Sequence, residues 1–117
     1  MVTFMINPVL ESILGNRSAA LVLLFIANYG EGHASRISKT FDVAVMGIQR
    51  QLKRLEENGV LVSRMVGSSR IFSFNERSPT VKDFRKFLEC ELERLPKEAK
   101  TKYFRQRQRP RRSGKPL

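Results

Sequence analysis

Hydrogen-bonding and cationic side chains gather on one side of the segment from 44 to 58, AVMGIQRQLKRLEEN. At about 100° per residue, a helix here would place Ile48, Leu52 and Leu55 on an apolar stripe and Met46, Gln49, Arg50 and Lys53 on the opposite one. Glutamine makes paired hydrogen bonds to adenine, arginine makes them to guanine, and lysine favours phosphate. We therefore predict a helix with one face in a protein core and Gln49, Arg50 and Lys53 turned towards an anionic partner, against the alternative of a solvated face.

The residues after this helix predict a β-hairpin. Asn58-Gly59 is expected to end the helix, because glycine adopts the left-handed conformation at little cost. Strands are expected over 60–66 (VLVSRMV) and 71–75 (IFSFN), which are rich in β-branched and aromatic residues.

The connection between the expected strands carries a second set of candidate contacts. Ser68, Ser69 and Arg70 combine small hydroxyls with a guanidinium, which suits a phosphate or a minor groove. Arg64, on the first strand, is a further candidate. The alternative is an ordinary hairpin turn exposed to solvent.

A shorter helix is expected just before the amphipathic one, over 35–40 (SRISKT). Two helices joined by a tight turn match the helix-turn-helix plan, in which the second helix enters the major groove and the first crosses the backbone. Arg36 on the first helix is expected to meet a phosphate. Val45 and Met46 give the second helix an apolar start, which suits thymine methyl groups or, alternatively, a protein surface.

The run from 34 to 75 resembles the winged helix-turn-helix core of ArsR-like and related bacterial or archaeal transcriptional regulators. Its most telling passage is LKRLEENGVLVSR (52–64), which is similar to the L-x-x-L-x-x-x-G-[LV]-[LV] pattern between recognition helix and wing in that superfamily. The resemblance extends over about residues 8 to 95. It implies a winged-helix fold, sequence-specific binding of double-stranded DNA, and usually a homodimer.

Two helices are expected before this core. Asn7-Pro8 predicts the start of a short helix that Gly15 ends. From Asn16 to about Tyr29 a second helix is apolar nearly all round, so we expect the other elements to pack against it. Its apolar run, AALVLLFIA, is well short of the roughly 20 residues that cross a bilayer, and no signal peptide is visible, so no membrane partner is expected.

A long helix is expected after the hairpin, from Ser78-Pro79 to Leu95. Its apolar stripe consists of Val81, Phe84, Leu88, Leu92 and Leu95. We predict that this stripe forms a dimer interface, with packing on the chain's own domain as the alternative. Over 97–105 another short helical turn is expected, with Tyr103-Phe104 able to return to the body.

The net charge of +11 is concentrated at the C-terminal end. Residues 97–117 hold nine lysines and arginines against the single acid Glu98, so +8 lies there and +3 in residues 1–96. The last residues lack apolar periodicity and are expected to be disordered when free. Their arginines are candidates to follow a nucleic-acid backbone: Arg107, Arg109, Arg111 and Arg112.

His33 and Cys90 each stand alone among the residues that commonly bind metals. A zinc site needs three or four good ligands, so no metal and no cofactor are expected. A single cysteine cannot form an internal disulfide, which favours a reducing, cytoplasmic location. Glycine-rich phosphate loops, nucleophiles with a histidine partner and spaced carboxylate pairs are lacking, so catalytic residues are not expected.

Together these patterns predict a mainly α fold with a small β-hairpin, a winged helix-turn-helix with an extra C-terminal helix. Residues 1–95 would form the DNA-binding domain including a dimerisation helix, and 96–117 a basic, partly disordered tail. The expected function is a DNA-binding transcriptional regulator that acts as a repressor and as a homodimer. The alternatives are a winged-helix module that binds protein, or a non-specific nucleic-acid binder led by the tail.

Overall fold

The computed structural model describes residues 6–105, which form six helices and one antiparallel hairpin. In chain order these are α1 (Pro8–Leu14), α2 (Arg17–Tyr29), α3 (Ala34–Phe41), α4 (Val45–Glu57), β1 (Leu61–Val66), β2 (Ser69–Phe74), α5 (Pro79–Glu93) and α6 (Lys97–Tyr103). The expected mainly α fold with one hairpin and an extra C-terminal helix is confirmed.

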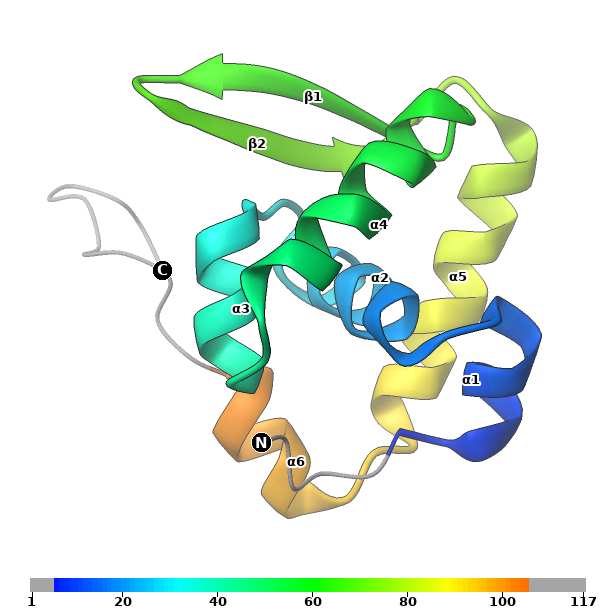
Figure 1. The fold of residues 1–117 in the computed structure, drawn as a ribbon. Helices are drawn as coiled ribbons and strands as arrows, with labels where there is room; N and C mark the ends of the chain where they lie inside the picture. Colours follow the sequence, from blue (N-terminus) through cyan, green and yellow to red (C-terminus); the bar gives the residue numbers. More distant parts are fainter. Residues whose placement is uncertain (1–5, 106–117) are drawn as a thin grey trace, which may run out of the picture.

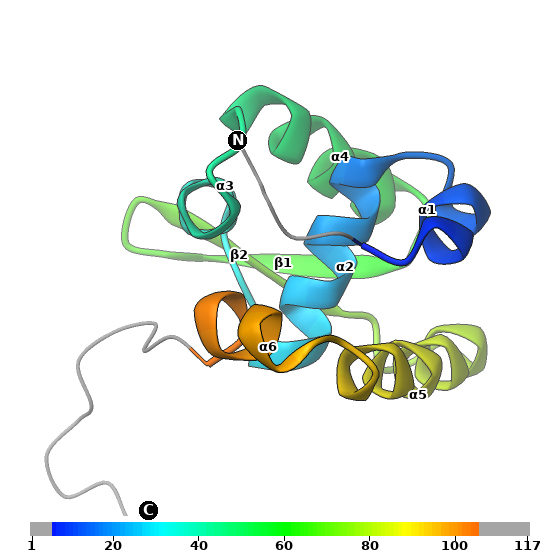
Figure 2. The same ribbon diagram turned by 90° about the horizontal axis from the view of Figure 1, so that it is seen from below.

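Helix α2 runs through the middle of the molecule, and the other elements surround it (Figures 1 and 2). Every residue from 19 to 27 is buried, as expected for a helix that is apolar nearly all round. Its neighbours are α1, α3, α4, α5 and β2. Among the described residues no single helix is long and apolar enough to cross a membrane; α1 and α2 reach that composition only as a pair bent by 103°.

Polar caps set the start of three helices where the sequence predicted them. The Asn7 side chain accepts a hydrogen bond from Val9 N–H at the start of α1, and Asn16 accepts one from Ala19 N–H at the start of α2. Ser78 does the same for α5, which begins with a proline as α1 does. These bonds satisfy amide groups that have no partner within the helix.

The hairpin is tighter than the sequence indicated. Val66 pairs with Ser69, so only Gly67 and Ser68 connect the strands, and Gly67 takes a positive φ of 63°. The predicted connection of four residues is therefore too long, because Ser69 and Arg70 continue the ladder as part of β2.

A short bridge joins the hairpin to the loop before α3. Gly32 and Phe72 exchange both backbone hydrogen bonds, at 3.0 and 2.8 Å. The bridge ties the loop before α3 to β2.

The folded body continues beyond Leu95. Tyr103 and Phe104, at the end of α6, are 4% and 5% exposed, which confirms that they return to the body. Helix α6 therefore packs on the body of the molecule through buried aromatic side chains at its end. The predicted arginine contacts at 107, 109, 111 and 112 lie outside the described residues.

Candidate nucleic-acid interface

The two faces of α4 lie as the sequence predicted. Its apolar residues Ile48, Leu52 and Leu55 are 0%, 1% and 5% exposed, in contact with the core around α2. Gln49, Arg50 and Lys53 are exposed. Burial of the apolar stripe thus fixes the rotation of the helix and leaves its polar side chains facing outward.

The turn before α4 holds that helix at a defined angle to α3. Asp42 has a left-handed backbone with φ 56°, and the Ser38 hydroxyl donates a 2.5 Å hydrogen bond to the Val43 carbonyl. Helix α4 then begins at Val45 without a side-chain cap. Met46, in its first turn, is 66% exposed, so an apolar side chain stands at the outer end of the helix beside the half-buried Val45.

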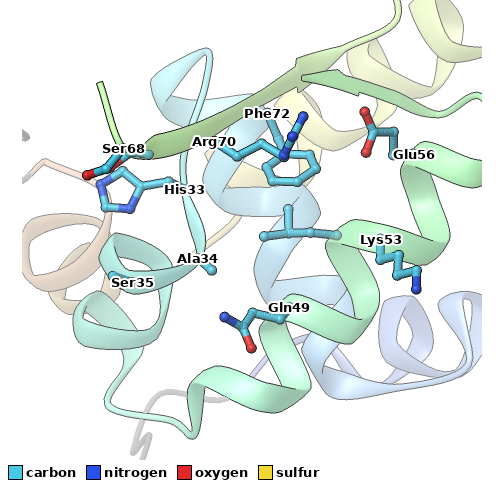
Figure 3. A pocket seen from close by; sticks show the side chains of 11 residues that line it. His33, Ala34, Ser35, Gln49, Lys53, Glu56, Ser68, Arg70 and Phe72 are labelled. Atoms are coloured by element: carbon cyan, nitrogen blue, oxygen red, sulfur yellow. The ribbon is translucent and has the colours of Figure 1, made fainter. Parts of the chain in front are cut away.

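A groove of about 450 Å³ separates α4 from the hairpin, with the start of α3 closing one end (Figure 3). Half of the ten candidate contact residues line it: Gln49 and Lys53 from α4, and Ser68, Ser69 and Arg70 from the hairpin. Sequence positions some twenty residues apart therefore meet across one groove, which carries two cationic side chains and several hydrogen-bonding groups.

The other candidates lie apart from this groove. Arg50 and the Val45–Met46 pair belong to the outer surface of α4, and Arg36 lines a second groove, of about 490 Å³, with Gly32 and Ile71.

Arg64 is turned to the other face of the hairpin from Arg70. It pairs with Ile71 in the ladder while Arg70 pairs with Met65, and side chains alternate along a strand. Its guanidinium forms a 3.0 Å ion pair with Glu31. Arg64 therefore does not line the groove between α4 and the hairpin, because the alternation of side chains along β1 places Arg64 on the opposite face.

Two polar residues that line the groove, Glu56 and His33, were not among the contacts predicted from the sequence. Glu56 lines it from α4, and its carboxylate accepts a 2.5 Å hydrogen bond from Ser63 on β1. His33 lines it from the loop before α3 and caps that helix, with Nδ1 accepting from Arg36 N–H at 3.4 Å. Burial, and then the nearby Arg36 charge, lower the pKa of His33 below its ordinary value. The position of His33 just before α3 could have predicted this cap from the sequence, although Ser, Thr, Asp and Asn are the usual capping residues.

The apolar stripe of α5 packs largely on the chain's own core. Val81 and Leu88 are 6% and 0% exposed, and the other stripe residues, Phe84, Leu92 and Leu95, are half-buried against the same core. Leu88 has no surface left for a second chain, so the alternative of packing within the domain accounts for it. Phe87, beside the stripe, is 38% exposed and stacks on Phe84 with ring centroids 6.0 Å apart.

Metal-binding residues do not cluster in the part of the chain that the structure describes. No three His, Cys, Asp or Glu side chains between 6 and 105 are placed to share an ion. Cys90 is exposed on α5.

Several solved structures have a similar fold, and one of them is a transcriptional repressor. Reduced HlyU from Vibrio cholerae N16961 is 17% identical over 71% of this chain and 84% of its own, with a TM-score of 0.56. The antimony-specific repressor AntR is 20% identical over 80% of this chain and 79% of its own, also at 0.56. Reduced AbfR bound to DNA is 20% identical over 78% and 67%, at 0.52.

The chain has a winged helix-turn-helix fold. Helices α3 and α4 are its helix-turn-helix, and the hairpin β1–β2 is its wing. No protein-family model and no curated protein matches the chain. The assignment of fold therefore depends on the arrangement of the elements and not on sequence identity.

Proposed function

We propose that this protein binds double-stranded DNA as a transcriptional regulator, with α4 in the major groove. One observation carries the proposal: Gln49, Arg50 and Lys53 are exposed on α4 while its apolar residues are buried. A major groove admits an α-helix, and Gln and Arg can each make paired hydrogen bonds to a base edge there. Gln49 and Arg50 are assigned to base readout and Lys53 to phosphate.

The groove between α4 and the wing suits the sugar-phosphate strand that separates a major groove from the next minor groove. Lys53 lines one wall and Arg70 the other, so an anionic strand lying between them would meet cations on both sides. Ser68 and Ser69 add hydroxyl donors from the wing. Met46, exposed at the outer end of α4, is placed to contact a thymine methyl group.

One structural neighbour supports DNA binding and another supports repression. AbfR was solved bound to DNA, and AntR is described as a transcriptional repressor. We infer repression, by occupation of a promoter, for the present chain. Its assignment to the ArsR-like group rests on the resemblance of residues 52–64 to the passage from recognition helix to wing.

The test begins with in vitro selection of duplexes and continues with fluorescence anisotropy on the selected sequence. Replacing Gln49 or Arg50 by alanine is expected to cost about 1 to 3 kcal/mol each and to relax the preferred base at one position. Lys82→Ala removes one exposed positive charge from α5 and is the matched control, expected to keep the base preference. An unchanged preference in the Gln49→Ala/Arg50→Ala double variant would reject the readout assignment.

A shortened chain distinguishes the proposed regulator from a nucleic-acid binder led by the tail and from a module that binds protein. A chain ending at Arg105 keeps α6 and removes the arginine-rich end, whereas ending at residue 95 would also remove buried aromatic side chains. We expect the shortened chain to bind more weakly with a shallower salt dependence and to rank duplexes as before. Loss of all ranking would favour a nucleic-acid binder led by the tail, and absence of duplex binding by either form would favour a module that binds protein through Val45 and Met46.

A homodimer is the proposed assembly, and exposed apolar residues on α1 and α5 support it. Val9 and Ile13 are both 65% exposed and lie one helical turn apart on α1, and Phe87 is exposed on α5. Sedimentation of the wild-type chain is expected to give a dimer. Val9→Asp/Ile13→Asp is expected to give a folded monomer, whereas Lys82→Asp changes a charge on α5 and should remain dimeric.

A further inference from the structure

A chain of hydrogen bonds links the wing arginine to the recognition helix. Arg70 Nη1 donates to Ser63 Oγ at 3.0 Å, and Ser63 Oγ donates to a Glu56 carboxylate oxygen at 2.5 Å. Arg70 belongs to β2, Ser63 to β1 and Glu56 to α4. The hydrogen bonds therefore join both strands of the wing to the recognition helix. Figure 3 shows Glu56 and Arg70 at the groove wall.

The strand register brings the three side chains together. Ser63 is opposite Phe72 and Arg70 is opposite Met65, so the serine and the arginine are diagonal neighbours on one face of the hairpin. Glu56 lies on the last turns of α4, half-buried beneath that face. The serine hydroxyl accepts from Arg70 and donates to Glu56, because a hydroxyl has one donor and two acceptor lone pairs.

A carboxylate is unexpected in a groove that suits an anionic strand, because it would repel phosphate. It is, however, bound to Ser63, which in turn accepts a hydrogen bond from Arg70. An exposed arginine otherwise samples many rotamers, and holding it in one costs conformational entropy that must be met when a ligand binds. The guanidinium has five N–H donors, and Ser63 engages one nitrogen, leaving others for a ligand.

We propose that Glu56, acting through Ser63, is a positioning residue that holds Arg70 over the groove before DNA arrives. The wing and α4 thereby meet the backbone strand between them as one surface, and Arg70 binds phosphate without being ordered at that moment. The proposal rests on the DNA-binding function given above and adds to it the two residues that orient its wing contact.

The test is a double-mutant cycle on the selected duplex, measured by anisotropy at several salt concentrations. Arg70→Ala is expected to weaken binding and lower the salt slope by about 1, as for the loss of one phosphate contact. Ser63→Ala, which leaves both charges in place, is expected to weaken binding about three- to tenfold, a hydrogen-bond-sized effect. The Ser63→Ala/Arg70→Ala variant should bind no more weakly than Arg70→Ala alone.

Two outcomes would overturn the proposal: Ser63→Ala binding like the wild type, or Ser63→Ala weakening binding equally with and without Arg70. Glu56→Ala separates orientation from repulsion. A carboxylate that only repels phosphate would, on removal, raise affinity equally in both backgrounds, whereas a positioning carboxylate has an effect that changes when Arg70 is absent. Thermal unfolding of each variant checks that the fold is retained.

A measurement without DNA keeps this proposal distinct from the proposed function. The Nε–H group of Arg70 gives a side-chain NMR signal whose heteronuclear relaxation reports motion on the picosecond to nanosecond timescale. It is expected to be restrained in the wild type and mobile in Ser63→Ala, with the Arg77 side chain as an exposed reference. A mobile Arg70 in the wild type would overturn the positioning role, whereas a restrained Arg70 in a protein that binds no duplex would overturn only the function.

Discussion

The Tyr103 ring stacks on Phe41 with centroids 5.6 Å apart and planes inclined by 29°. Phe41 is the last residue of α3, so the end of α6 lies directly against the helix-turn-helix. Two side chains of α2 complete the attachment: Tyr29 Oη donates to the Tyr103 carbonyl at 2.6 Å, and Asn28 Nδ2 donates to the Phe104 carbonyl at 2.7 Å. The last described segment of the chain thus packs on α3, the first helix of the helix-turn-helix.

Tyr103→Ala is expected to lower the free energy of unfolding by about 3 kcal/mol, because it leaves a cavity beside Phe41. Urea denaturation followed by far-ultraviolet circular dichroism measures this. Thr101→Ala, at an exposed position of the same helix, is the control and should change stability by less than about 0.5 kcal/mol. Equal stability of the two variants would mean that α6 does not support the fold.

Gly32→Ala is expected to destabilise the protein by about 1 to 3 kcal/mol through steric overlap. A Cβ at this position would lie 2.6 Å from Cε1 and 2.8 Å from Cδ1 of the buried Phe25 ring. Because Gly32 is bridged to Phe72, the backbone has little freedom to move away. In thermal unfolding, Phe25→Leu should cost less in the Gly32→Ala background than in the wild type, and strict additivity would exclude the overlap as the cause.

Asn7 joins the start of α1 to the end of α5 through a buried carboxylate. Its Oδ1 caps α1, and its Nδ2 donates to Glu91 at 3.2 Å; Glu91 also accepts from Arg94 at 2.5 Å. Asn7→Asp keeps the cap but sets a second carboxylate beside Glu91, whereas Asn7→Ser keeps the cap and only loses the bond. We expect the aspartate variant to be less stable than the serine variant by about 1 kcal/mol in urea at neutral pH, although both residues are good caps. The reverse order would contradict this contact.

The His33 cap predicts a pH dependence of stability. The folded pKa of His33 lies below its ordinary value of about 6.5, so protons bind more readily to the unfolded chain. The contribution of His33 to the free energy of unfolding is therefore fully present above the ordinary pKa of histidine. It declines as the pH falls towards the pKa of the folded state. His33→Asn supplies a cap that does not titrate, and its unfolding free energy is expected to fall less than that of the wild type between pH 7.5 and 5.5. Parallel pH profiles would show that His33 titrates alike in both states.

Sequence patterns alone predicted each helix, because the signals are local. Asn7-Pro8, Asn16 and Ser78-Pro79 satisfy or spare the first amide groups of a helix wherever the chain later packs. The alternation of buried and exposed positions on α4 likewise follows from the helical period, so its outward face was predictable from residue types.

Relations between elements needed the tertiary structure. The apolar stripe of α5 could face a second chain or the core of its own domain, and the sequence does not decide between them. In the structure α5 packs on α2, and Leu88 is buried in the domain's own core. Strand register decided that Arg70 faces the groove and Arg64 the opposite side, because one residue of slip exchanges the two faces. The link from Arg70 through Ser63 to Glu56 joins residues that no local period relates, since side chains become neighbours in this way only when the hairpin folds onto the helix.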